Sequence, residues 1–373
     1  MEETTMNIAI VDIAAENSGA LSVLLDFVDF IDNSNDAKQY NWFVFVSNCK
    51  HFNKKNNHIN IIELPNVKKS WGHRLLWDLI SCSKYFNKYK IDLIISLQNT
   101  GFPFVRNIPQ IVYFHNMLLL EDKNKYSLFN ANERKFAIYT KVLSRYTQFS
   151  LKKVNEVIVQ TKSVKANMEK KWKINKIIAV KPNIELSGIT VNERIGKSIN
   201  GLIYPANSII FKRHDEIIEC INKHMNWFTD NDFKIIFTID GTENSLAEGL
   251  YDKARNNKNI EFMGYVKREK IYNLMNYYGL FLNSEIESYP IPFEEAKTKG
   301  IPILAADYPY AREILEEYEN KLLFKKHDLE DMFDKIVEIS KNKIIPQKIV
   351  PIKYNTWNNV LHEIKNVYSK WEK

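Results

Sequence analysis

The stretch SEIESYPIPFEEAKTKGIPILAAD, residues 284–307, carries two acids, Glu287 and Glu295, eight positions apart. The residues GLFLNSE are typical of a strand, IESYPIP of a turn, and PFEEAKTKG of a helix. This helix is expected to begin at Pro292 and end at Gly300, because proline is favoured in a first helical turn and glycine just after the last one. Glu287 is therefore expected at a strand end, and Glu295 within the first turns of the following helix.

The N-terminus of this helix is expected to bind an anion such as a diphosphate. Backbone N–H groups around Ile291, Phe293 and Glu294 lack partners within the helix, and the helix dipole favours negative charge there. Glu295 would project toward the same ligand, where a carboxylate can accept hydrogen bonds from the vicinal hydroxyls of a ribose or pyranose. On the spacing alone, the simpler explanation is that both acids only stabilise the helix N-terminus.

Short β-branched runs alternate with amphipathic segments along most of the chain. Near-continuous apolar runs of this length are typical of parallel strands that are buried on both faces. The alternation pauses in the polar stretch 179–200 and then restarts, which predicts an α/β chain of two doubly wound, Rossmann-like domains facing a cleft. The expected strands are MNIAIVDI, WFVFVSN, INIIEL, DLIISL, IPQIVYFHN, NEVIVQT and KIIAV in the first half, and GLIYPAN, FKIIFTID, NIEFMGY, GLFLNSE and IPILAAD in the second.

We expect the first domain to span residues 1–185 and the second residues 186–350. The final segment, 351–373, contains an amphipathic helix pattern and is expected to pack back toward the first domain. Between INIIEL and DLIISL, apolar residues recur at helical spacing, which supports a βαβ unit; they are Leu75, Leu76, Leu79 and Ile80.

Composition excludes several classes of protein. No apolar run approaches the roughly 18 residues of a membrane span, and the 45% apolar content suits packed globular domains. The first residues lack the basic and apolar segments of a secretory signal, so we expect a cytoplasmic protein. Cys49, Cys82 and Cys220 have no metal-ligand or redox spacing.

Positive charge is concentrated in the first half of the chain. Residues 1–180 hold 25 Lys and Arg against 16 Asp and Glu, and residues 51–180 alone hold 23 against 8. Such a surface suits anionic lipid, a diphosphate-bearing substrate or nucleic acid, and a lysine-rich solvated surface is the simpler alternative. Aromatic residues interleave with these charges, among them Trp71, Trp77, Tyr85, Phe86 and Tyr89.

The sequence around residues 284–307 resembles the donor-site signature of family 4 GT-B glycosyltransferases, the E-x7-E motif. The resemblance continues through GLIYPANSIIFKRHDEII, residues 201–218, and through the stretch that ends in the strand before Glu287. In the first half, ENSGALSVLLDF resembles the glycine-containing loop of this family, and VYFHNM resembles its strand end with a histidine. Pro290 stands where the family often has glycine, Asn207 stands where it often has a basic residue, and NSGA stands where it has a double glycine.

The resemblance implies a role for each matching residue. Glu295 would bind the nucleotide ribose, Glu287 would hold the hydroxyls of the donor sugar, and Lys212 would neutralise the departing diphosphate. His115 would contact the donor sugar or the oxocarbenium-like transition state. The first domain would then bind the acceptor and the second the nucleotide-sugar donor. Further donor-binding residues would be Arg213, Asn207, Ser288, Tyr289, Ile291, Gly264 and Gly19.

In this family the anomeric configuration is retained and no metal or other cofactor is required. The pair Asp230-x-Asp232 precedes a strand instead of ending one, so it is expected to be a solvated turn rather than a metal site. No G-x-G-x-x-G or G-x-x-x-x-G-K-[ST] pattern occurs, which argues against nicotinamide and P-loop chemistry. A GT-B sugar-nucleotide epimerase is the alternative enzyme, and a non-catalytic scaffold that binds nucleic acid or membrane is the alternative from another class.

The basic, aromatic first domain suggests a membrane-borne acceptor. We expect a polyprenyl-diphosphate-linked glycan in surface-polysaccharide synthesis, such as O-antigen or capsule, with the enzyme peripheral to the inner face of the plasma membrane and without nucleic acid. The candidate lipid-contacting residues are Lys68, Lys69, Trp71, Arg74 and Trp77.

Overall fold

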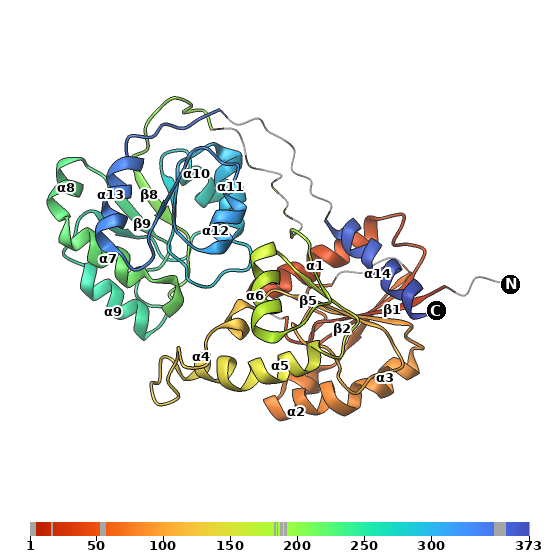
Figure 1. The fold of residues 1–373 in the computed structure, drawn as a ribbon. Helices are drawn as coiled ribbons and strands as arrows, with labels where there is room; N and C mark the ends of the chain where they lie inside the picture. The colour runs from red at the N-terminus through yellow and green to blue at the C-terminus, as the bar shows by residue number, and fades with distance from the viewer. Residues whose placement is uncertain are drawn as a thin grey trace. The chain divides into compact units, whose positions relative to one another are not determined.

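The computed structural model describes residues 5–15, 18–52, 57–182, 184, 186, 189, 192–346 and 356–372. The chain divides into two compact units: unit 1 is Met1–Asn183 with Tyr354–Lys373, and unit 2 is Ile184–Lys353. Each unit contains one fully parallel sheet with helices on its faces, as Figure 1 shows. The predicted fold class, two doubly wound α/β domains, is therefore confirmed.

Unit 1 is built on a seven-stranded sheet in the order β3-β2-β1-β4-β5-β6-β7. All seven predicted strands of this half are present. The central strands β4 and β5 are buried along their whole length, which is why their sequences are continuous apolar runs rather than alternating ones. The strands are β1 (Asn7–Val11), β2 (Asn41–Val46), β3 (Ile59–Glu63), β4 (Leu93–Ser96), β5 (Gln110–Phe114), β6 (Glu156–Val159) and β7 (Ile177–Ala179).

The helices of unit 1 include two that change geometry along their length. One runs from residue 71 to 88 and the other from 134 to 151, and each contains a π-helical turn. The helical elements are α1 (Ser18–Asn33), η1 (Pro65–Lys68), α2 (Trp71–Leu76), η2 (Trp77–Ser81), α3 (Cys82–Lys88), η3 (Met117–Leu120), α4 (Arg134–Ile138), η4 (Tyr139–Leu143), α5 (Ser144–Leu151), α6 (Lys162–Trp172) and α14 (Trp357–Trp371).

The C-terminal helix α14 packs into the core of unit 1. Trp357, Leu361 and Ile364 are buried in the same apolar cluster as Ile8 and Phe27. The Trp357 ring lies 4.6 Å from that of Phe27, and its indole N–H donates a hydrogen bond to Asp26 at 2.6 Å. The amphipathic stripe read from the sequence is the surface that these contacts bury.

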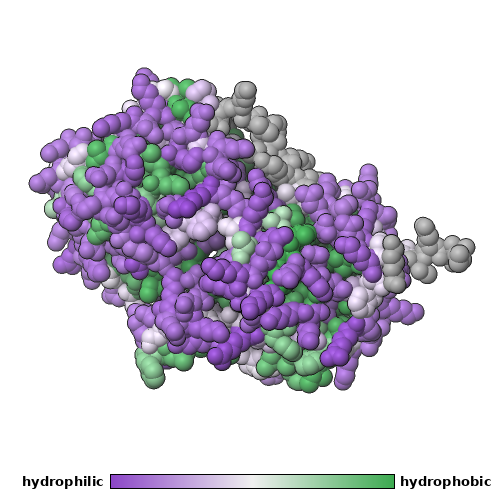
Figure 2. All heavy atoms as spheres, viewed as in Figure 1, coloured by the Kyte–Doolittle hydropathy of each residue, from purple (hydrophilic) through white to green (hydrophobic). Residues whose placement is uncertain are grey.

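The predicted helix between β3 and β4 exists, but its apolar residues face two ways. Trp77 and Phe86 enter a buried cluster with Phe45. Leu75 and Ile80, whose spacing supported the βαβ prediction, are exposed. Figure 2 shows apolar side chains gathered at the lower edge of unit 1, where Figure 1 draws α2.

Unit 2 has a six-stranded sheet in the order β10-β9-β8-β11-β12-β13. The five predicted strands are present. β13 was missed because it has only four residues, KLLF, of which the first three are only partly buried, so its pattern is weak. The strands are β8 (Gly201–Tyr204), β9 (Lys234–Phe237), β10 (Ile260–Phe262), β11 (Gly279–Leu282), β12 (Ile303–Ala306) and β13 (Lys321–Phe324).

The helices of unit 2 follow the strands in alternation. The helix predicted over HDEIIECINKHMNWF is two helices that break at His224. The helical elements are η5 (Ile210–Lys212), α7 (His214–Lys223), α8 (Met225–Asp230), α9 (Ser245–Ala254), α10 (Arg268–Leu274), α11 (Ile291–Lys299), α12 (Pro309–Ile314) and α13 (Leu329–Ile339). Gly300 ends α11 in the left-handed conformation, with φ 66°.

Candidate active site

The strand order of unit 2 reverses between β8 and β11, and the candidate site lies there. In a doubly wound sheet the loops that leave such a pair of strands run to opposite sides and leave room for a ligand at their carboxyl ends. The loop after β8 carries Lys212 and Arg213, and the loop after β11 carries Glu285 and Glu287. The backbone N–H of Glu285 donates to the carbonyl of Phe211 at 2.8 Å, so the two loops are tied together.

Lys212 and Glu287 form an ion pair between the Lys Nζ and the Glu Oε1. Each side chain exposes only 17% of its surface. Lys212 is the last residue of η5, and the hydroxyl of Tyr204 donates to its carbonyl at 2.7 Å. The ammonium and the carboxylate are thereby held side by side at the end of the central strands.

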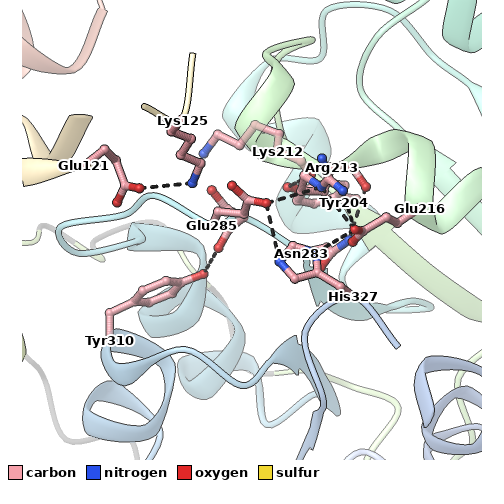
Figure 3. Close-up of polar contacts among 11 residues, drawn as sticks. Glu121, Lys125, Tyr204, Lys212, Arg213, Glu216, Asn283, Glu285, Tyr310 and His327 are labelled. Atoms are coloured by element: carbon pink, nitrogen blue, oxygen red, sulfur yellow. Dashed lines mark hydrogen bonds and ion pairs between the residues drawn. The ribbon is translucent and has the colours of Figure 1, made fainter. Parts of the chain in front are cut away.

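Arg213 lies beside this pair but is engaged by acids of unit 2. It has a left-handed backbone, with φ 52°, and its guanidinium contacts Glu216 and lies 3.4 Å from Glu285 (Figure 3). Glu216 also accepts from Asn283 at 3.1 Å and is 2.7 Å from the Nδ1 of His327. Burial would raise the pKa of Glu216, but these three hydrogen bonds outweigh it and lower the pKa.

Glu295 projects from α11 and is held by two residues of α10. Its Oε1 accepts from the Nε of Arg268 at 2.7 Å and from the hydroxyl of Tyr272 at 2.9 Å. The Glu295 side chain is almost fully buried, whereas Arg268 is half exposed. One carboxylate oxygen is thus fixed by the protein, and the carboxylate is oriented before any ligand arrives.

The N-terminus of α11 offers fewer free donors than the sequence suggested. Pro290 and Pro292 have no N–H, and the N–H of Phe293 donates to the carbonyl of Pro290 at 3.1 Å. Ile291, the first residue of the helix, is exposed. Glu294 is buried and accepts from Tyr289 and Lys297, so its role is structural.

The remaining predicted donor-site residues of unit 2 lie at loop positions. Asn207 is exposed after β8, while Ser288 is half-buried and Tyr289 is buried after β11. Gly264 has φ +67°, and a Cβ there would come within 2.7 Å of Asp240 Oδ2, so a side chain would be strained.

Two predicted residues lie in unit 1. His115 follows β5, and its backbone N–H donates to Asn99 Oδ1 at 2.7 Å. Burial lowers the pKa of His115 to about 4, so its ring is neutral at physiological pH. Gly19 lies in the first turn of α1, where a Cβ would meet no atom within 4 Å.

The predicted lipid-contacting residues fall into two groups. Lys68, Lys69 and Trp71 are exposed. Trp77 is buried among aromatic rings, so the prediction that it contacts lipid is wrong. The helix turns this residue inward, six positions after Trp71. Arg74 is half-buried and bonds Asp78 through its Nε at 3.1 Å.

Asp230 and Asp232 are exposed at the end of α8. Within the described ranges, no group of three or more His, Cys, Asp or Glu side chains is arranged to hold a metal ion. No helix in the same ranges has both the length and the apolar character needed to cross a bilayer.

The two parallel sheets, with charged loops at the switch point of the second, define a two-domain GT-B protein. Residues 199–356 match the family model described as Glycosyl transferases group 1. The matched segment supports a group 1 glycosyltransferase domain and includes the loops of Lys212, Glu287 and Glu295.

Known proteins resemble this chain in sequence or in fold. Poly(ribitol-phosphate) alpha-N-acetylglucosaminyltransferase of Staphylococcus aureus (strain COL) is 20% identical over 352 residues, covering 86% of this chain and 70% of that protein. The fold resembles sucrose-phosphate synthase from Thermosynechococcus elongatus, with a TM-score of 0.68, 12% identity and 98% of each chain covered. It also resembles the lipopolysaccharide outer core galactosyltransferase WaaB in its apo form, with a TM-score of 0.65, 16% identity, and 96% of this chain and 99% of that chain covered.

Sequence reasoning missed the residues that hold the predicted ones in place. Glu216, Glu285 and His327 surround Arg213, and Arg268 and Tyr272 hold Glu295. These residues come from different elements, so no local sequence pattern predicts that they contact one another. Only the short KREK run with Arg268 could have drawn attention, because this cation lies about one helical turn before an aromatic residue.

Arg268→Ala is expected to weaken nucleotide binding about tenfold, because Glu295 would lose a charge-assisted hydrogen bond that orients its carboxylate. Calorimetric titration with UDP, GDP and dTDP measures the effect. Arg268→Lys should restore part of the affinity. Arg255→Ala, at the end of α9, is the matched control and should leave it unchanged. Equal or tighter binding by Arg268→Ala would contradict the positioning role.

His115 should make the protein less stable as pH falls from about 6.5 to 4. The unfolded chain binds a proton near the ordinary pKa of 6.5, whereas the native ring binds one only near 4, so stability is complete above 6.5 and is lost below it. The loss should reach about 3 kcal/mol. Urea unfolding at several pH values measures it.

The comparison variant is His115→Gln, which cannot take up this proton. Asp12, whose pKa burial raises to about 7, has the opposite pH dependence, but it is present in both proteins and cancels in their difference. The difference in stability between the two proteins should therefore change with pH only in this window. A constant difference would show that the ring is not shielded.

Proposed function

We propose that the chain is a retaining, metal-independent family 4 glycosyltransferase that transfers a hexosyl or deoxyhexosyl group from a nucleoside-diphosphate sugar to a glycan acceptor. The observation that carries the proposal is the ion pair of Lys212 with Glu287 at the switch point of the unit 2 sheet. It brings one cation and one hydrogen-bond acceptor to the place where the diphosphate and the sugar of a donor would meet. The group 1 glycosyltransferase domain covers both residues.

Lys212 would act on the leaving group. As the bond from the anomeric carbon to the diphosphate breaks, negative charge grows on the phosphate oxygen, and the nearby ammonium stabilises that charge. In this exchange Lys212 turns from Glu287 to the phosphate. Glu287 then accepts hydrogen bonds from the hydroxyls of the sugar, which fixes the anomeric carbon relative to the acceptor.

Glu295 would bind the nucleoside. Its Oε1 is occupied by Arg268 and Tyr272, which leaves Oε2 as the acceptor for the vicinal ribose hydroxyls. The exposed first turn of α11 would approach the diphosphate, although only part of its N–H groups can donate. The positive charge for the diphosphate therefore falls mainly to Lys212, because the nearby Arg213 is engaged with Glu216 and Glu285.

For the acceptor we propose a polyprenyl-diphosphate-linked glycan, extended for a surface polysaccharide such as O-antigen or capsule. The names of two similar proteins refer to a poly(ribitol-phosphate) and to the outer core of lipopolysaccharide. The basic surface of unit 1, with Lys68, Lys69 and Trp71 exposed, supports a place at the inner face of the plasma membrane.

Calorimetry with UDP-, GDP- and dTDP-sugars tests the donor proposal. One of them should bind and, at 100 times its dissociation constant, stabilise the fold by about 2.7 kcal/mol. Glu287→Ala should abolish transfer but retain binding, whereas Glu295→Ala should chiefly weaken binding. Glu317→Ala, an exposed acid near α12, is the control. Wild-type kinetics in both site variants would remove these acids from the mechanism.

The stereochemistry of the product tests the reaction class. NMR of the product should show the anomeric configuration of the donor, and transfer should continue in EDTA. An inverted product or an absolute need for a metal ion would contradict the proposal. Conversion of a nucleotide sugar incubated without any acceptor into its epimer would instead favour an epimerase.

A further inference from the structure

Unit 1 carries an exposed apolar surface made by two helices, which we call the paired-helix face. One helix comprises α2, η2 and α3, and the other comprises α4, η4 and α5. Trp71 is 62% exposed and Ile80 and Val142 are each 58% exposed, values far above those of core residues. The face consists of Trp71, Leu75, Leu76, Ile80, Ile138, Val142 and Phe149.

The two helices lie side by side and run in the same direction. The rings of Trp71 and Tyr139 meet edge to face, with centroids 6.2 Å apart. Seven residues further along both helices, burial and the neighbouring Asp78 carboxylate raise the pKa of Tyr146, which places these two side chains together. Equal offsets at both contacts mean parallel helices, as Figure 1 draws them.

The second helix presents apolar side chains outward although it buries several polar ones. Its buried side mixes four hydroxyl residues with Ala137 and Leu151, whereas its exposed side presents Ile138, Val142 and Phe149. A helix in water normally turns its apolar stripe to the core. An outward apolar stripe backed by small hydroxyl side chains suits a surface whose surroundings are not water. The buried hydroxyl residues are Thr140, Ser144, Thr147 and Ser150.

Charge on and beside the paired-helix face has one sign. Residues 65–90 contain six Lys and Arg, and residues 134–153 contain six more. The same two ranges contain a single acid, Asp78, which is buried and bonded to Arg74. Within these two ranges the cations therefore outnumber the acids by twelve to one.

We propose that the paired-helix face docks on an anionic phospholipid bilayer, an inference that rests on the proposed function for its membrane-borne acceptor and names the surface that meets the membrane. Leu75, Leu76, Ile80 and Val142 enter the boundary between headgroups and acyl chains. Trp71 lies at headgroup level, where indole rings are favoured. The surrounding Lys and Arg side chains keep their charges among the lipid phosphates.

Charge also decides between this partner and a second copy of the chain. A two-fold dimer through the face would bring the same basic ranges of two copies together. Like charges brought together oppose such an interface. Anionic lipid headgroups complement the same charges.

Flotation with vesicles tests the proposal, using phosphatidylcholine alone and phosphatidylcholine with about one third phosphatidylglycerol. The protein should bind the anionic vesicles, and added salt should release it. Lys68→Glu with Lys69→Glu should weaken binding roughly 30-fold or more, since each lysine near the surface contributes to attraction. Ile80→Ser with Val142→Ser, one residue from each helix, should weaken it about tenfold.

Lys162→Glu with Lys170→Glu, on α6, repeats the charge change at exposed positions of another helix and should bind like the unaltered protein. Thermal unfolding of every variant shows whether it is folded. If the variant with Ile80→Ser and Val142→Ser is unstable, the variant with Lys68→Glu and Lys69→Glu still tests the proposal. Equal recovery with both kinds of vesicle, no binding to either, or wild-type binding by both face variants would overturn the proposal.

Two further outcomes would also overturn the proposal. The first is dimerisation through Ile80 and Val142 in light scattering without vesicles. The second is salt-dependent binding to a random oligonucleotide that the Lys68 and Lys69 change removes while vesicle binding persists. Transfer to a water-soluble acceptor is measured separately. If that transfer fails while anionic vesicles still bind, the proposed function fails and the docking surface stands.

Discussion

The parallel pairing of β8 with β11 determines where the charged groups of the candidate active site lie. The two strands begin with Gly201 and Gly279, and each glycine allows a close approach. A Cβ on Gly201 would fall 2.0 Å from the carbonyl oxygen of Lys234, and one on Gly279 would fall 2.8 Å from that of Pro302. Side chains at either position would push neighbouring strands apart and shift the loops that follow. The register of these central strands therefore sets the distance between Lys212 and its partner acid.

Within unit 2, the charged residues of the site form ion pairs, so the site does not present charges of one sign only. Lys212 is matched by Glu287, and Arg268 by Glu295. Half-buried charges are costly when single and tolerable when paired and hydrogen-bonded. This arrangement keeps the unliganded site stable, and it also means that an anionic ligand must exchange partners with Glu287 instead of entering an empty cationic pocket. Arg213 is bonded to Glu216 and lies beside Glu285, so it helps to hold the loops between which that exchange takes place.

The sequence predicted the two-domain fold, all strands of unit 1, and the loop and helix that carry Glu287 and Glu295, because these depend on local periodicity and on turn residues at fixed spacing. It could not predict β13, whose short, half-buried pattern differs little from a loop. It also missed the partners of the site acids, since Arg268 meets Glu295 through tertiary packing across 27 positions. The prediction for Trp77 was wrong for a related reason. The sequence shows a tryptophan near lysines, but the direction in which its side chain points depends on how the helix is turned against the core.

The two units differ in charge in a way that matches different partners. Residues 1–183 with 354–373 contain 29 Lys and Arg against 18 Asp and Glu, whereas residues 184–353 contain 23 against 27. A net negative unit cannot attract a nucleotide diphosphate by its overall field, so donor binding must depend on short-range contacts such as that of Lys212. The positive unit, in contrast, has a long-range attraction for anionic surfaces, and its exposed apolar side chains lie within that basic region. Long-range attraction can bring unit 1 to a lipid surface. Recognition of the donor in unit 2 depends instead on contacts within the site, because salt at physiological concentration screens charges that lie more than about 8 Å away.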